Sequence, residues 1–162
     1  MSEISNKTCF WGSQGELGKL EEFIKNRDMY YDNKPENKGN VLIANILMTC
    51  DASESYKIIA KQFPGVEFVG YQFYHNCGEY DFAYSPKKDT NVSFVTPYSY
   101  EDDGDHYFDK NEPKSESKEP AWYEEVIDAV GMKGIEALFD LCQRDGDIDE
   151  NIFNGIPEFK RN

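Results

Sequence analysis

The stretch Val41–Cys50, VLIANILMTC, is an almost unbroken apolar run in a chain of 162 residues. It is rich in branched side chains, and it is too short to cross a bilayer as a helix, which takes roughly 20 residues. A continuous apolar run of this length is typical of a β-strand that is buried on both faces. The chain is therefore expected to fold around a sheet that contains this strand.

Two amphipathic helices are expected to flank this strand in the sequence. Residues 14–26 carry apolar side chains at helical spacing. Ser13, just before this segment, and Glu16, near its start, have the spacing of a capping box. The second helix follows the capping residue Asp51 and ends before Pro64, again with apolar residues at helical spacing.

The remaining apolar segments predict further strands and hence the fold class. The expected strands are at residues 8–11, 29–31 (a short edge strand), 66–74, 79–85 and 92–98. Gly70 interrupts the alternation of its strand, so a β-bulge is expected there. The order of elements predicts an α+β fold: a ferredoxin-like sheet with two helices on one face, extended by a β-hairpin from the last two strands.

Two stretches resemble sequences of a family of small phage- and plasmid-borne proteins that carry a ferredoxin-like domain. They are GSQGELGKLEEFI (Gly12–Ile24) and FPGVEFVGYQFY (Phe63–Tyr74), and the resemblance covers about residues 8–75. The resemblance implies a ferredoxin-like fold and an origin on a mobile element. It brings no catalytic residues.

The composition changes after Tyr98, which predicts three segments. Residues 1–98 form the α+β domain, residues 99–119 an acidic linker or loop, and residues 120–162 an acidic C-terminal segment that contains a helical hairpin. Such a hairpin cannot bury its apolar side chains alone, so we expect it to pack on the sheet or on a partner.

The net charge of −14 is distributed unevenly along the chain. Residues 1–98 carry 13 acidic and 10 basic residues, whereas residues 99–162 carry 18 acidic and 7 basic residues, for a net charge of −11. Such a segment cannot make the phosphate contacts that drive nucleic-acid binding, and an anionic membrane repels it. A macromolecular partner of this segment is therefore expected to be a basic protein.

Acidic and aromatic residues alternate in YSYEDDGDHYFD, residues 98–109. A solvated loop would account for the acids alone, but aromatic side chains are typical anchors of interfaces, and the same sign of charge continues on the predicted C-terminal helices. The candidate partner-binding residues are Tyr100, Glu101, Asp102, Asp103, Asp105, Tyr107, Asp109, Glu124, Glu125, Asp128, Glu136 and Asp140.

No catalytic residue, metal site or cofactor motif is predicted. The cysteines are scattered and are expected to be buried apolar residues of a protein from a reducing compartment: Cys9, Cys50, Cys77 and Cys142. His75 lies near Cys77 without the glycine-rich turn of a nucleophile, and the cluster Asp145–Glu150 does not fit the ligand spacing of a calcium-binding EF-hand loop.

Three functions stay open from the sequence. The first is a non-catalytic acidic inhibitor of mobile-element origin that occludes a basic nucleic-acid-processing enzyme, as an anti-CRISPR protein does, without touching nucleic acid or membrane itself. The second is an immunity protein that neutralises a bacterial toxin. The third is a small metal-dependent enzyme that uses His75, Cys77 or the Asp145–Glu150 cluster. Neither a signal peptide nor a membrane span is recognisable, so a cytoplasmic protein of open oligomeric state is expected.

Overall fold

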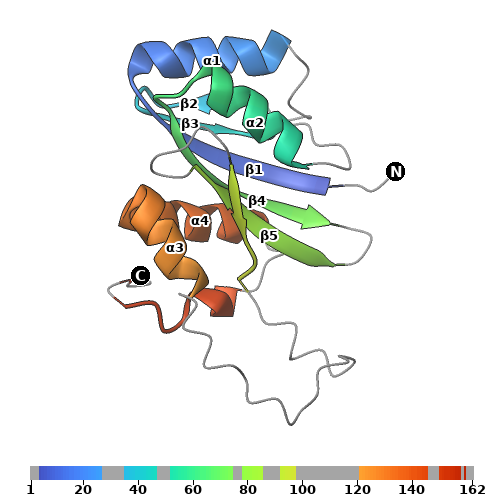
Figure 1. The fold of residues 1–162 in the computed structure, drawn as a ribbon, viewed down its shortest axis with the longest axis vertical. Coiled ribbons are helices and arrows are strands. Elements are labelled where there is room, and N and C mark those ends of the chain that lie inside the picture. Colours follow the sequence, from blue (N-terminus) through green and yellow to red (C-terminus); the bar gives the residue numbers. More distant parts are fainter. Residues whose placement is uncertain are drawn as a thin grey trace.

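The computed structural model describes residues 4–26, 35–46, 52–74, 78–85, 92–97, 121–145, 150–157 and 159. These residues form a mixed α+β structure, with one six-stranded antiparallel sheet and four α-helices that cover both of its faces (Figure 1). The strands are β1 (Ile4–Trp11), β2 (Glu36–Asn37), β3 (Val41–Ala44), β4 (Glu67–Tyr74), β5 (Glu79–Tyr84) and β6 (Ser93–Val95). The helices are α1 (Gln14–Asn26), α2 (Ala52–Gln62), α3 (Trp122–Val130), α4 (Met132–Asp145) and the short 3-10 helix η2 (Glu150–Phe153).

The strand order is β2-β3-β1-β4-β5-β6, so β1 and β4 lie at the centre of the sheet. The predicted hairpin is confirmed, since β5 and β6 pair with each other beyond β4. The predicted edge strand at residues 29–31 lies outside the described residues, and the edge strand that the structure describes at this end of the sheet is β2. None of the described helices is both long enough and apolar enough to cross a membrane.

The expected β-bulge at Gly70 is wrong. The pairing between β1 and β4 runs without interruption from Ile4 opposite Tyr74 to Trp11 opposite Glu67. Gly70 is required for space instead, because a Cβ atom at this position would lie 2.5 Å from Thr8 Oγ1 and 2.8 Å from the hydroxyl of Tyr56. The glycine thus lets α2 and β1 approach the middle of β4.

Helices α1 and α2 pack on one face of the sheet (Figure 1). The predicted capping box begins α1: the Glu16 backbone N–H donates to Ser13 Oγ at 3.2 Å, and the Ser13 N–H donates to Glu16 Oε1 at 3.5 Å. The core on this face contains fully buried side chains of both helices and of the central strands, among them Phe10, Leu17, Leu20, Ile24, Tyr56, Ile59 and Phe68.

The C-terminal hairpin of α3 and α4 packs on the opposite face of the sheet. Its apolar side chains meet those of β1, β4 and β5 in a second core, which includes Cys9, Val69, Tyr71, Phe82, Val126, Ile135, Leu138 and Cys142. Of the two alternatives expected for this hairpin, a sheet or a partner, the structure shows the sheet. The alternating residues of β4 therefore enter two different cores.

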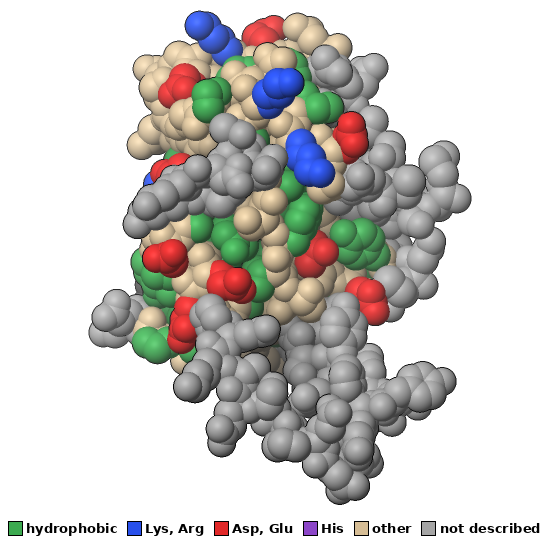
Figure 2. Space-filling model, in the orientation of Figure 1, with side chains coloured by type: hydrophobic (Ala, Val, Ile, Leu, Met, Phe, Trp, Pro, Cys, Tyr) green, Lys and Arg blue, Asp and Glu red, His purple; other side chains and the backbone are tan. Residues whose placement is uncertain are grey.

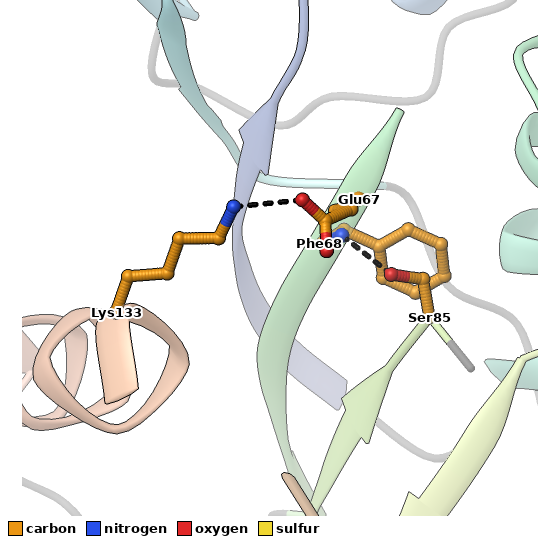
Figure 3. Close-up of polar contacts among 4 residues, drawn as sticks. All are labelled: Glu67, Phe68, Ser85 and Lys133. Carbon is orange, nitrogen blue, oxygen red and sulfur yellow. Dashed lines mark hydrogen bonds and ion pairs between the residues drawn. The ribbon is translucent and has the colours of Figure 1, made fainter. Parts of the chain in front are cut away.

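Polar contacts connect the start of β4 to helix α4 and to Ser85, the residue that follows β5 (Figure 3). Lys133 of α4 forms an ion pair of 2.7 Å with Glu67, and its ammonium lies 5.0 Å from the centre of the Trp11 ring. On the adjacent residue, the Phe68 backbone N–H donates to Ser85 Oγ at 2.9 Å. Because Lys133 and Glu67 are largely exposed, their ion pair is worth less than about 1 kcal/mol, and the apolar core provides most of the adhesion.

Gly134 determines how closely α4 approaches its neighbours. A Cβ atom at this buried position would lie 3.1 Å from Val126 Cγ1 of α3 and 3.3 Å from Val69 Cγ1 of β4. Both distances are shorter than ordinary van der Waals contact, so a larger side chain here has to push α4 away from the sheet.

We expect Gly134→Leu to lower the free energy of unfolding by about 2 kcal/mol, because overpacking a dense core costs about 1–3 kcal/mol. Urea denaturation would measure the change. The matched control is Gly18→Leu in α1, where a Cβ atom has no neighbour within 4 Å. That variant should gain roughly 0.5–1 kcal/mol from helix propensity. An equal loss in both variants would contradict the tight packing at Gly134.

Candidate functional site

The structure describes five of the predicted partner-binding residues. The seven from Tyr100 to Asp109 lie outside the described residues, so their arrangement stays a prediction. The other five are exposed side chains on two helices: Glu124, Glu125 and Asp128 on α3, and Glu136 and Asp140 on α4.

Glu124, Glu125 and Asp128 form the acidic patch of α3. They lie on the solvent side of a helix whose buried residues, Val126 and Val130, face the sheet. Figure 2 shows acidic side chains over the part of the molecule where α3 lies, whereas acidic and basic side chains both lie over α1 and α2. Burial is the main cause that raises the pKa of Tyr84 of β5, and the charges of Glu125 and Asp128 raise it further.

The three carboxylates of this patch have no ion-pair partner within the described part of the chain. Two of them, Glu124 and Glu125, lie in the first turn of α3, where the helix dipole favours negative charge. Glu124 and Asp128 are one helical turn apart, and like charges at this spacing repel each other weakly. A basic partner would remove that repulsion.

Asp140 has a different environment from the acids of α3. Its carboxylate lies 3.1 Å from Arg144 Nε, and Arg144 also forms an ion pair of 2.8 Å with Glu36 of β2. Bonding to Glu36 is the main cause that raises the pKa of Arg144. Since strands are spaced by about 4.8 Å, β2 and β5 lie about 19 Å apart in the sheet. The structure thus groups the three acids of α3. Asp140 lies apart from them, near the β2 edge of the sheet, where Arg144 partly neutralises its charge.

A second polar site lies buried between α2 and the sheet. We call it the Tyr56 cluster, and it consists of Asn6, Thr8, Tyr56 and Gln72, all of which are buried. The Tyr56 hydroxyl accepts hydrogen bonds from Asn6 Nδ2 (2.7 Å) and Gln72 Nε2 (2.6 Å), and it lies 2.8 Å from Thr8 Oγ1. Thr8 Oγ1 in turn donates to Asn6 Oδ1 at 3.2 Å, which closes a ring of hydrogen bonds.

Asn6 also connects the cluster to the backbone of β4 and of the segment that follows β3. Its Oδ1 accepts from the Ile46 backbone N–H at 3.0 Å, and its Nδ2 donates to the Tyr71 carbonyl at 3.2 Å. Asn6 thus uses its full capacity of two acceptor and two donor contacts. Such a saturated amide fixes the position of β1 relative to the segment that follows β3.

Asp81 of β5 extends this polar row across the sheet. It lies directly opposite Gln72, which itself lies opposite Asn6. Tyr74 donates a hydrogen bond to Asp81 Oδ2 at 3.3 Å. Burial raises the pKa of Asp81 to about 6, and the hydrogen bond from Tyr74 opposes this effect. Gln72 Oε1 and Asp81 Oδ1 are both buried without a hydrogen-bond partner.

The Tyr56 cluster does not have the chemistry of an active site. It contains only neutral amides and hydroxyls, and burial raises the pKa of Tyr56, so its hydroxyl stays protonated. Cys9 and Cys142 are buried on the other face of the sheet, as predicted, and burial raises the pKa of the Cys9 thiol to about 12. A protonated, buried thiol is not a nucleophile.

The described residues contain no group of three or more histidine, cysteine or acidic side chains arranged to hold a metal ion. His75, Cys77 and residues 146–149 lie outside this part of the chain, so the metal-enzyme alternative of the sequence analysis is untested at its own residues.

Sequence reasoning did not identify this polar row, which consists of Asn6, Thr8, Tyr56, Gln72 and Asp81. When only one face of a sheet is buried, the alternation of apolar and polar residues shows which polar side chains of a strand point into the core. Both faces of this sheet are buried, so the alternation does not distinguish polar side chains in the core from polar side chains at the surface.

No protein-family model, curated protein or solved structure matches this chain. The described residues define a mixed α+β protein with helices on both faces of an antiparallel sheet.

We expect Tyr56→Phe to lower the free energy of unfolding by about 3 kcal/mol. The change leaves the Asn6 and Gln72 amides with buried N–H groups that lack an acceptor, and each such group costs about 1–3 kcal/mol. Urea denaturation followed by tryptophan fluorescence would measure the loss. Tyr123→Phe is the control, because its hydroxyl has no bond to a described residue, and it should change stability by less than about 0.5 kcal/mol.

Proposed function

We propose that this protein is a small, cytoplasmic, non-catalytic inhibitor that binds a basic nucleic-acid-processing enzyme through an acidic surface, in the manner of an anti-CRISPR protein. The observation that carries the proposal is the acidic patch of α3, whose carboxylates have no cationic partner in the described part of the chain. This helix belongs to the segment of the chain that carries a net charge of −11.

The way α3 is held supports a role in binding. Trp122 packs against Phe82 of β5 and Phe153 of η2, with ring centres 5.2 Å and 5.6 Å apart. The helix is therefore fixed on the sheet, and its carboxylates are positioned before a partner arrives. Preorganised charges lose little entropy on binding, and they speed the encounter with an oppositely charged surface.

Partly exposed aromatic rings lie next to the acidic patch. Trp122 and Tyr123 are both half-buried at the start of α3, and their rings are in edge-to-face contact at 5.9 Å. Tyrosine and tryptophan are enriched among the residues that dominate binding energy at interfaces. The acids Glu101 to Asp109 precede this helix in the sequence, and we propose that they extend the same surface.

The proposal also includes a ferredoxin-like unit formed by β1, α1, β2, β3, α2 and β4. The strand order β2-β3-β1-β4, with every neighbouring pair antiparallel and both helices on one face, supports this topology. The origin on a mobile element rests on the sequence resemblance over residues 8–75.

Reversing the charge of the acidic patch should abolish inhibition while the fold is kept. We expect Glu124→Lys/Glu125→Lys/Asp128→Lys to weaken inhibition of an RNA-guided nuclease on a labelled DNA duplex by at least about tenfold, since each close charge pair contributes about 1.5 kcal/mol or more. For the unaltered protein, inhibition should also fall steeply as salt rises from 50 to 300 mM, because salt screens surface charge.

The matched control is Glu22→Lys/Glu54→Lys/Glu79→Lys, which changes the net charge equally at exposed sites on α1, α2 and β5. This variant should retain most of the inhibition. Equal loss in both variants would contradict a specific role for α3. Protection of cells against a co-expressed toxin nuclease, with no effect on guided nucleases, would instead favour the immunity-protein alternative.

A further inference from the structure

Gln72, which is fully buried, and Asp81, which is half-buried, do not have all their polar atoms in hydrogen bonds. The two residues are direct cross-strand partners in the antiparallel pair β4 and β5, so their Cβ atoms are about 4.5–5.5 Å apart. Each presents one buried oxygen without a hydrogen-bond partner, Gln72 Oε1 and Asp81 Oδ1. Gln72 is fully buried, and its Nε2 is already engaged by the Tyr56 hydroxyl, so the amide orientation is set.

Gln72 Oε1 and Asp81 Oδ1 are acceptors on directly opposed residues, and a buried acceptor without a donor destabilises the fold. A single proton on Asp81 Oδ1 would convert one acceptor into a donor and satisfy both atoms at once. We propose that in mildly acidic solution Asp81 is protonated in the folded protein and donates a hydrogen bond from Oδ1 to Gln72 Oε1, as a pH-dependent latch between β4 and β5 at the edge of the Tyr56 cluster.

The surroundings of Asp81 favour the neutral carboxyl. Burial raises its pKa to about 6 from a usual value of 3.8. The titratable groups that face it from the described elements are Tyr74 of β4, Tyr56 of α2 and Glu79 two residues away on β5 itself, and none of them carries positive charge. The described residues of β6 include no titratable side chain. Burial is the main cause of the raised pKa of Tyr56, and the charge of Asp81 contributes to it.

The latch has a defined pH dependence. A carboxyl whose pKa is raised in the folded state stabilises the fold at low pH, and this contribution is lost as the pH rises through the folded value. The contribution of Asp81 should therefore be complete below about pH 4 and lost above about pH 6. A shift from 3.8 to about 6 means that the folded protein binds this proton on the order of 100-fold more tightly than the unfolded chain does.

Nuclear magnetic resonance on the full chain tests the latch directly. Between pH 4 and pH 8, the Asp81 carboxyl carbon and the Gln72 side-chain amide should titrate together, with one midpoint near pH 6. In Asp81→Asn, whose amide N–H can donate to the same oxygen and cannot ionise, the Gln72 titration should disappear. The unfolding equilibrium constant of the natural protein should rise by up to about 100-fold more between pH 4 and pH 7 than that of Asp81→Asn.

The control is Glu79→Gln, which removes an exposed acid from the same face of β5. It should leave the joint titration of Asp81 and Gln72 unchanged. A midpoint for Asp81 near pH 4, or a Gln72 side chain that does not follow Asp81, would overturn the proposal. The titration of the natural protein decides the question even if Asp81→Asn fails to fold.

Discussion

The pairing of β1 with β4 is the interaction on which the rest of the structure depends. The two strands lie at the centre of the sheet and are joined over the full length from Ile4 to Trp11. Successive side chains of each strand enter opposite cores, so a shift of one residue in register would exchange the two sets. The positions of α1 and α2 on one face, and of α3 and α4 on the other, follow from this single register.

The two faces of this central pair differ in chemistry, which explains why each helix layer docks on its own face. On the α2 face, Asn6, Thr8 and Gln72 require hydrogen bonds, and Tyr56 supplies them from one hydroxyl. The opposite face of the same strands presents mainly apolar side chains to the C-terminal hairpin, together with Glu67, which pairs with Lys133 of α4. A network of buried hydrogen bonds such as this one favours a single arrangement of α2 on the sheet, which apolar packing specifies less strictly.

The sequence was sufficient for the features that depend on local spacing. Residues 14–26 were expected to be a helix with a capping box at Ser13, and the structure shows both. The sequence was insufficient where residues far apart decide the outcome. Gly70 suggested a bulge because its contacts, Thr8 and Tyr56, cannot be identified from β4 alone. The ion pair of Arg144 with Glu36 likewise joins segments that the sequence does not show to be neighbours.

Strand β5 connects the buried polar row to the acidic surface. Asp81 faces the Tyr56 cluster, whereas the next residue, Phe82, points to the other side of the sheet and contacts Trp122 of α3. Two adjacent residues of β5 therefore have different roles: Asp81 is the carboxyl with the raised pKa, and Phe82 contacts the Trp122 ring that anchors α3. Because a strand moves as a unit within its ladder of hydrogen bonds, a displacement of β5 caused by ionisation of Asp81 would also shift the support of α3. The carboxyl of the proposed latch and the acidic helix thus share β5 as a common support, although they lie on opposite faces of the sheet.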